Sequence, residues 1–171
     1  HTTAATYAKI IAAYPHAAAL PWLPDVARLE WASHEALLAA DAPPCDFAGL
    51  AAVPEEDQEQ LAFMLHPSVR LERSAWPVLA IWEANQPDRD GTPDRDTGAD
   101  DVLVWREDNR VRMALLAQDQ AAIVAGLAIG RPLGELADPG LGEEFAALLA
   151  WLAGHGMLAG FAVMPGRLDA G

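Results

Sequence analysis

The stretch DVLVWREDNRVRMALLA, Asp101–Ala117, decides the fold class of this chain. Apolar and polar residues alternate in two runs on either side of Asp108 and Asn109, which is the pattern of two β-strands joined by a tight turn. The glycine that such a turn favours is missing, but the alternation on both sides still indicates a hairpin. The sequence therefore predicts an antiparallel pair of strands here.

Helices and one more strand follow the hairpin. QDQAAIVAGLAIG is predicted to be a helix that ends at Gly130, and the short segment PLGELAD comes next. In GEEFAALLAWLAGHG, apolar residues at helical spacing form one face: Phe145, Leu148, Leu149 and Leu152. The final run, MLAGFAVM, is expected to be a strand.

The N-terminal half also reads as helices and strands. LPWLPDVARLEWASHEALLAAD predicts a helix, because Pro24 suits the first turn and Asp25 complements the positive helix end. Apolar residues recur in it at steps of three and four, which gives one buried stripe. LAFMLHPSVRLER is expected to be extended on both sides of a break at His66, and PVLAIWEAN to be a short helix. A short amphipathic helix is expected at Thr3–Tyr14.

Together these elements predict an α+β fold with a mainly antiparallel sheet and flanking helices. Residues 1–85 are expected to form a helical segment plus a strand pair, and residues 102–165 the hairpin, three helices and a strand. Residues 86–101, QPDRDGTPDRDTGADD, contain six aspartates and two arginines, which predicts a mobile acidic loop between the two parts. One compact domain is the alternative.

The composition excludes several classes of protein. The chain has 171 residues and a formal net charge of −14, from 25 acidic and 11 basic residues, so it should repel phosphate and be a poor general nucleic-acid binder. Its apolar runs are far shorter than the roughly 20 residues of a spanning helix, so we expect a soluble protein with no membrane partner. The single cysteine, Cys45, excludes an internal disulfide and fits a reducing, cytoplasmic compartment.

No motif for catalysis or for a cofactor is found in the sequence. HExxH, GxSxG, the P-loop and GxGxxG are all missing. His34 is better interpreted as a helix-surface residue paired with Glu30 than as a metal ligand, and His66 as a structural or partner-facing residue. The acidic loop does not place glycine and glutamate where a calcium loop needs them. We therefore expect no enzyme, no cofactor and no metal; an enzyme that uses scattered carboxylates or histidines with a metal is the alternative.

Arginines gather with an aromatic residue only at the hairpin. Arg110 and Arg112 share one face by strand alternation, and Arg70 and Arg73 are expected nearby. The simpler interpretation is that these arginines pair with the surrounding acids. The alternative is a surface that docks a partner. Its candidate residues are Trp105, Arg106, Arg110, Arg112 and Arg70.

Three ordered segments, DVARLEWA, LHPSVRL and VLVWR, resemble the HvfC/BufC family of bacterial proteins, which carry the label of DNA-binding or regulatory proteins. The resemblance covers roughly residues 5–163. Family members usually have a helical N-terminal domain, to which the DNA-binding label refers, and the resemblance implies that this chain begins just after it. It therefore implies no nucleic-acid binding by this fragment.

The resemblance implies a partner role instead. Members of the family are accessory subunits of multinuclear non-heme iron-dependent oxidative enzymes, to which they deliver a ribosomally made precursor peptide. The iron then belongs to the other subunit. Residues 102–165 are also similar in element order to a winged-helix precursor-recognition element, which holds a peptide as an added strand. The alternatives are an ordinary α+β domain and a transcriptional regulator whose DNA-binding domain is missing here.

Overall fold

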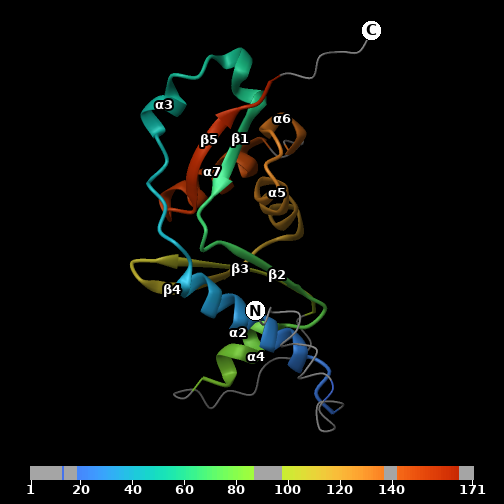
Figure 1. Ribbon diagram of the computed structural model, residues 1–171. Helices are drawn as coiled ribbons and strands as arrows, with labels where there is room; N and C mark the ends of the chain where they lie inside the picture. The colour runs from blue at the N-terminus through green and yellow to red at the C-terminus, as the bar shows by residue number, and fades with distance from the viewer. Residues whose placement is uncertain (1–12, 14–18, 87–97, 137–141, 166–171) are drawn as a thin grey trace. The chain divides into compact units, whose positions relative to one another are not determined.

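A computed structural model describes residues 13, 19–86, 98–136 and 142–165 of the chain (Figure 1). The helices are α2 (Leu23–Leu38), α3 (Phe47–Ala51), the 3-10 helix η2 (Glu55–Gln60), α4 (Val78–Ala84), α5 (Gln118–Ala128), α6 (Leu133–Leu136) and α7 (Gly142–Gly154). The strands are β1 (Leu61–Leu65), β2 (Arg70–Ser74), β3 (Asp100–Glu107), β4 (Arg110–Leu115) and β5 (Leu158–Val163). Helices with antiparallel sheets confirm the predicted α+β class. The helix expected at Thr3–Tyr14 and most of the acidic loop lie outside the described residues.

The chain divides into two compact units, each built from two separate segments. Unit 1 comprises residues 1–39 and 70–117, and unit 2 comprises residues 40–69 and 118–171. The sequence suggested a different division, at the acidic loop. Strand pairing explains the difference, because β1 and β2 are close in sequence but belong to different sheets. The strand pair that was expected within residues 1–85 is therefore not formed.

Unit 1 is a three-stranded antiparallel sheet in the order β2-β3-β4, with α2 and α4 against one face. Alternate side chains of β3 point toward these helices, as the two-residue period of a strand requires. Val102 and Val104 of β3 thus join the helix residues in one buried cluster, which also contains Leu29, Ala32, Ala36 and Val78. The apolar stripe predicted for α2 is thus the surface that packs on the sheet.

The hairpin and two helix ends agree with the local sequence signals. Asp108 and Asn109 both have positive φ, at 49° and 59°, as a two-residue turn of the hairpin type requires. Pro24 lies in the first turn of α2. Gly130, with φ 73°, follows α5 in the left-handed conformation that commonly ends a helix.

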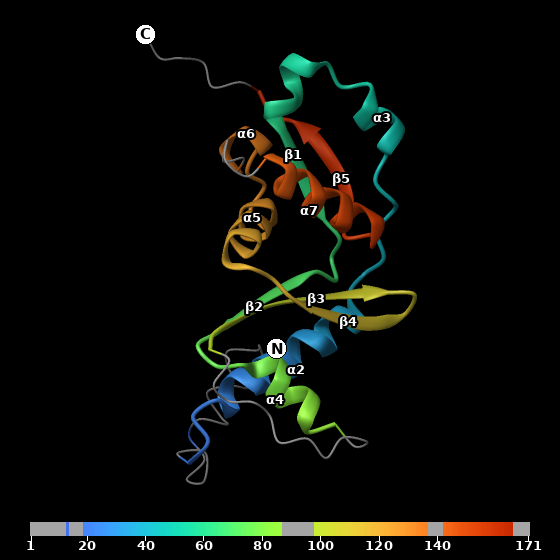
Figure 2. The same ribbon diagram turned by 180° about the vertical axis from the view of Figure 1, so that it is seen from behind.

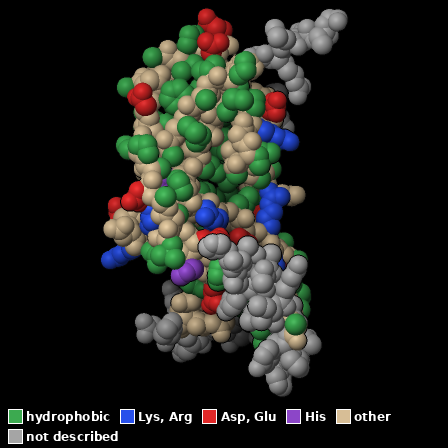
Figure 3. All heavy atoms as spheres, viewed as in Figure 1, with side chains coloured by type: hydrophobic (Ala, Val, Ile, Leu, Met, Phe, Trp, Pro, Cys, Tyr) green, Lys and Arg blue, Asp and Glu red, His purple; other side chains and the backbone are tan. Residues whose placement is uncertain are grey.

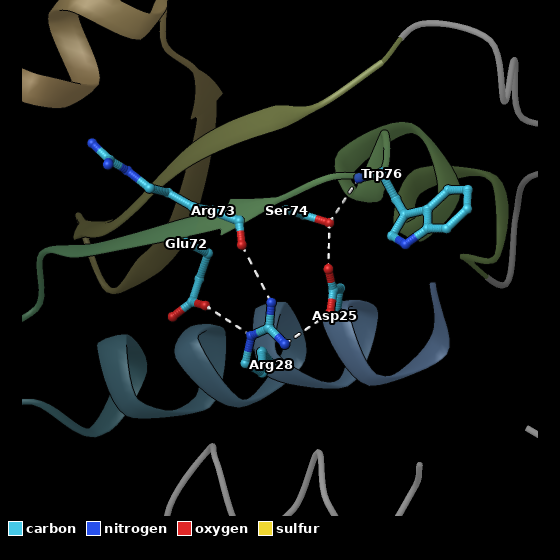
Figure 4. Close-up of polar contacts among 6 residues, drawn as sticks. All are labelled: Asp25, Arg28, Glu72, Arg73, Ser74 and Trp76. Atoms are coloured by element: carbon cyan, nitrogen blue, oxygen red, sulfur yellow. Dashed lines mark hydrogen bonds and ion pairs between the residues drawn. The ribbon is translucent and has the colours of Figure 1, made fainter. Parts of the chain in front are cut away.

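A polar network joins α2 to the edge strand β2 (Figure 4). Arg28 makes a 2.8 Å ion pair with Asp25, donates a hydrogen bond to the Arg73 carbonyl at 3.2 Å, and reaches Glu72 at 3.8 Å. The Ser74 hydroxyl donates to Asp25 Oδ2 at 2.6 Å and accepts from the backbone N–H of Trp76 at 3.0 Å. The charges of the α2 segment therefore fix the helix to the sheet, in addition to facing solvent.

Unit 2 is a two-stranded antiparallel sheet of β1 and β5 with several helices around it. Helices α5 and α6 contact β1, and η2 contacts α6 and β5. The β1 residues Leu61, Ala62 and Phe63 are all buried. Of the face predicted for α7, Phe145, Leu148 and Leu152 are buried and Leu149 is half-buried. The winged-helix-like element expected in residues 102–165 is divided, because its hairpin belongs to unit 1 and its helices and last strand to unit 2.

The six tryptophans differ in burial. Trp105 is buried, at 4% exposure, whereas the other five are half-buried. Trp76 and Trp82 pack against the margin of the unit 1 cluster, and Trp22 meets Trp76 edge to face with ring centres 6.0 Å apart. Most of these rings therefore cover the core margin and do not fill its centre.

Candidate functional site

Three of the five candidate docking residues share one face of the unit 1 sheet. Trp105 pairs with Arg112 across β3 and β4, and Arg110 pairs with Glu107, so alternation puts their side chains on the same side. Trp105 is buried, Arg110 is exposed, and the half-exposed Arg112 makes a 3.4 Å ion pair with Glu107. This face therefore presents arginines beside one acid.

The other two candidates lie on the opposite face, against α2. Arg106 donates hydrogen bonds to the carbonyls of Leu37 at 2.9 Å and Ala39 at 2.7 Å, which lie at the C-terminal end of the helix. Arg70 pairs with Glu35 of α2 at 3.4 Å. Both arginines hold the helix on the sheet; Arg70 pairs with an acid, as the simpler sequence interpretation expected, whereas Arg106 binds main-chain carbonyls. The five candidates thus do not form one surface.

A groove of about 500 Å³ runs between α2, α4 and β4 of unit 1. Its lining includes His34 and Leu37 from α2, Trp82 and Glu83 from α4, and Met113 from β4. The surface is mixed, with acidic, basic and apolar side chains together. It offers room for a partner side chain but no single chemistry that identifies one.

The open edge of β5 is a second candidate, in unit 2. In the part of the chain that the structure describes, β5 pairs with β1 alone. The N–H of Met164 donates to the Gln60 carbonyl at 2.9 Å, so alternation turns the main-chain groups of Phe161 and Val163 away from β1. An N–H and a carbonyl from each of these two residues are thus directed along the outer edge of β5.

An apolar pocket of about 390 Å³ adjoins this sheet. Its lining comes from α3, η2, β1, α6, α7 and β5 and includes Phe47, Leu50, Phe63, Leu133 and Leu149. In both ribbon views α3 lies on the side of β5 that is away from β1, whereas α5 and α6 lie on the side of β1 (Figures 1 and 2). Both α3 and α6 line the pocket, so it extends across one face of the sheet from the side of β5 to the side of β1.

Side chains next to the open edge lie on the same face of the sheet as the apolar pocket. Phe161 and Val163 pair with Phe63 and Leu61, which line the pocket, so all four side chains share the pocket face. Phe63 and Phe161 meet edge to face with ring centres 6.5 Å apart. A strand added opposite Phe161 would place its own side chain on this face.

A second, acidic hollow of about 350 Å³ lies at the end of β5. Glu59, Glu135, Met164 and Pro165 line it. Gln58 lines the apolar hollow, and the next residue, Glu59, lines the acidic one. Figure 3 shows hydrophobic side chains gathered on the surface of unit 2, with acidic ones at its margin.

Two side chains of unit 2 that could act as nucleophiles, Cys45 and Ser68, lie in surroundings that suit a structural role. Burial raises the pKa of the Cys45 thiol, and the neighbouring Asp46 raises it further, so the reactive thiolate is disfavoured. Ser68 is 1% exposed, and its hydroxyl oxygen lies 2.9 Å from His66 Nδ1. Its backbone N–H also donates to that nitrogen, at 3.1 Å. A hydroxyl so buried is out of reach of a substrate, and the pair fixes the turn after β1.

Within the described ranges, no group of three or more His, Cys, Asp or Glu side chains is arranged to hold a metal ion. None of the described helices has both the length and the apolar character needed to cross a bilayer. Comparison with protein-family models, with curated proteins and with solved structures found no match.

Sequence reasoning did not find the edge of β5 or its pocket. MLAGFAVM was expected to be a strand, but no local signal says that its partner is β1, which pairs with it from about a hundred residues away. The apolar run LAFML was the available hint, since a strand buried on both faces needs a partner and a cover.

Proposed function

We propose that this chain is a non-catalytic accessory protein that binds a multinuclear non-heme iron-dependent oxidative enzyme together with that enzyme's ribosomally made precursor peptide. The resemblance of DVARLEWA, LHPSVRL and VLVWR to the HvfC/BufC family supports the identity of the partners. The open edge of β5 beside an apolar pocket supports a role in holding a peptide. This edge is the observation on which the proposal depends.

The peptide would bind as a third strand. Phe161 and Val163 direct four main-chain groups outward, enough for two pairs of hydrogen bonds to an antiparallel peptide. Main-chain bonds supply affinity for any extended segment, and pockets for alternate side chains supply selectivity. The apolar pocket lined by Phe47 and Leu50 would take one such side chain.

The enzyme would dock on unit 1. Arg110 is exposed on the hairpin, and Arg112 shares its face of the sheet. Arginine is enriched at protein interfaces, where its planar group can bind a carboxylate through two hydrogen bonds. Arg106 and Arg70 are left out of this docking surface, because they hold α2.

Substitution of one edge residue tests the proposal. Val163→Pro removes an outward N–H but no bond to β1, because Val163 and Leu61 face each other as a non-hydrogen-bonded pair. We expect this change to weaken retention of the precursor by about tenfold or more, because a peptide carbonyl loses its donor. The measurement is co-purification of tagged chain, enzyme and precursor, with the bound precursor quantified by mass spectrometry.

Val163→Ala is the matched control. It removes the exposed side chain but keeps the backbone N–H, so precursor retention should remain close to that of the original chain. Absence of any complex with the enzyme at micromolar concentrations would refute the proposed function as a whole.

A further inference from the structure

We infer that this chain forms a symmetric dimer in which the outer edge of β4 pairs with the β4 edge of a second copy. The three-stranded sheets of the two copies of unit 1 would then join into one continuous antiparallel sheet. This inference goes beyond the proposed function, which places a peptide on β5 of unit 2. It depends on the open edge of β4, on the groove beside that edge and on the exposed side chain of Leu115.

The sheet of unit 1 has two edge strands, β2 and β4, and different groups meet their outer sides. The outer side of β2 is engaged by α2, since Arg28 donates a hydrogen bond to the Arg73 carbonyl at 3.2 Å (Figure 4). Among the described strands, β4 pairs with β3 alone. Main-chain groups along an edge strand are a template for pairing with another chain. The edge of this sheet at which a further strand can be added is therefore that of β4.

Three residues of β4 direct their main-chain groups to the outer side. The N–H of Leu116 donates to the Asp101 carbonyl of β3 at 2.9 Å, so alternation turns Val111, Met113 and Leu115 the other way. These three residues are evenly spaced about Met113. A second copy that runs antiparallel and is centred on Met113 therefore pairs Val111 of each chain with Leu115 of the other. Each of these pairs would exchange two main-chain hydrogen bonds.

The exposed side chain of Leu115 fits the groove that lies beside the same edge. Leu115 is 57% exposed and lies on the helix-covered face of the sheet with Val111 and Met113, because it pairs with Val102. The strand side of the groove of about 500 Å³ comes from β4 and includes Val111 and Met113. In the symmetric pair, Leu115 of the second copy would stand opposite Val111, with the two Cα atoms about 5.5 Å apart. Each copy would thus supply an apolar side chain to the groove of the other.

This spacing favours a second copy over an unrelated peptide as the occupant of the edge. The exposed Leu115 and the groove residue Val111 lie four positions apart on one strand. A two-fold axis through the centre of β4 brings each of them to the other in both copies at once, which is the self-complementarity of a symmetric interface. A peptide would need an apolar residue of its own at the matching position, whereas the second copy always has it.

Charge does not oppose the pairing. Unit 1 contains thirteen acidic and nine basic residues, a net charge of −4, whereas unit 2 contains twelve acidic and two basic residues, a net charge of −10. The proposed interface therefore lies in the unit with the weaker self-repulsion. In this register Arg112 of one copy would stand opposite Ala114 of the other, and Arg110 opposite Leu116. Like charges thus do not face each other across the two β4 strands.

Sedimentation velocity of the full chain over a concentration series tests the inference. An interface made by two short strands is small, so we expect a dissociation constant on the order of 10 μM. The weight-average mass should rise from that of the 18.2 kDa monomer towards twice this value as concentration increases through that range. A chain that stays monomeric at concentrations well above about 100 μM would overturn the inference.

Leu115→Lys tests whether the dimer uses this edge. Lysine suits an exposed strand position, and it would place a charge beside the groove of the second copy, so we expect the dimer to dissociate at least about tenfold more readily. Met64→Lys is the matched control: Met64 of β1 is 56% exposed, lies in unit 2, and undergoes the same change of charge. Its dimer should be as stable as that of the original chain. Far-UV circular dichroism verifies that both variants are folded.

Two outcomes of this comparison count against the dimer at β4. Equal weakening of self-association in both lysine variants would show that it does not depend on the β4 edge. If the chain stays monomeric but Leu115→Lys lowers retention of the precursor by the enzyme complex, the edge binds the peptide and no second copy. The test of the proposed function by Val163→Pro, at the edge of β5, is independent of both results.

Met113→Cys tests the register of the pairing. The two-fold axis would put the introduced thiols on directly opposite residues, with Cα atoms about 5.5 Å apart, within reach of a disulfide. Arg110→Cys is the matched control, because its thiol is more exposed on the same hairpin but lies at opposite ends of the paired strands in the two copies. We expect mild oxidation to link Met113→Cys into a covalent dimer, seen by non-reducing electrophoresis and intact mass. Equal or better linking of Arg110→Cys would overturn the inference.

Discussion

At the scale of the residue, the buried carboxyl group of Asp100 joins two elements, β3 and α4. It begins β3, is 8% exposed, and accepts a hydrogen bond from the backbone N–H of Leu79 at 3.0 Å, in the first turn of α4. Burial raises the pKa of Asp100; the Leu79 hydrogen bond lowers it by less, and the neighbouring Asp101 raises it again. Asp100 thus caps a short helix at the cost of burying its carboxyl group.

The raised pKa of Asp100 predicts a pH dependence of stability. In the interval above its ordinary pKa the folded chain binds more protons than the unfolded chain, so this group's contribution to stability falls as pH rises. Asp100→Asn keeps an acceptor for Leu79 and lacks the titration. We expect its free energy of unfolding, relative to the original chain, to increase from about pH 3 to about pH 8, as measured by urea denaturation.

A second substitution separates charge from capping. Asp100→Ala removes the acceptor for the Leu79 N–H and should destabilise the chain by about 1 kcal/mol. A difference between Asp100→Asn and the original chain that stays constant with pH would contradict the prediction. Glu72, whose pKa is also raised, mainly by burial, is present in every variant and cancels in the comparison.

At the scale of the element, α2 is held on its sheet at both ends. Arg28 and Ser74 connect its first two turns to β2. Arg106 connects its last turn to β3 by donating to two carbonyls that lack partners within the helix. A cation at a helix C-terminus also interacts favourably with the helix dipole. An arginine of the hairpin is therefore part of the framework of unit 1.

Substitution of Arg106 should reveal this structural role. Arg106→Met keeps most of the aliphatic stem and removes the donors, so we expect a loss of about 1–3 kcal/mol in the free energy of unfolding. Arg110→Met is the matched control on the same hairpin; its exposed side chain should matter by less than about 0.5 kcal/mol. Both are measured by denaturant unfolding. Equal stability of the two variants would mean that the helix end does not depend on Arg106.

At the scale of the whole molecule, charge is distributed unevenly between the two units. Unit 2 carries −10 and unit 1 carries −4, so neither unit has an excess of cations with which to bind a polyanion. Arg110 and Arg112 share their face with Glu107, which is paired with Arg112 at 3.4 Å. This charge distribution does not favour binding of DNA by either unit.

We predict that the chain does not bind duplex DNA. Binding to phosphate must weaken steeply as salt rises, because counterions are released from the duplex. Fluorescence anisotropy with a labelled duplex, repeated over a salt series, should show no salt-dependent change at micromolar protein. A dissociation constant that rises steeply with salt would revive the regulator hypothesis.

Local signals in the sequence predicted most elements of this fold. The turn at Asp108-Asn109, the end of α5 before Gly130 and the apolar face of α7 all depend on residues within one or two turns of each other. The pairing of β1 with β5 depends on residues far apart in the chain, so the open edge could not be predicted. Arg106 could not be assigned for the same reason, since its partners at Leu37 and Ala39 are distant in sequence.

The pairing of β1 with β5 has a consequence for folding during synthesis of the chain. The apolar strand Leu61–Leu65 emerges during synthesis long before Leu158–Val163, its sole partner among the described strands. Until Leu158–Val163 are made, Leu61, Ala62 and Phe63 lack the strand beside which they are buried in the folded chain. An uncovered apolar strand is prone to aggregate. Nascent chains that stall before Leu158 should therefore depend on chaperones.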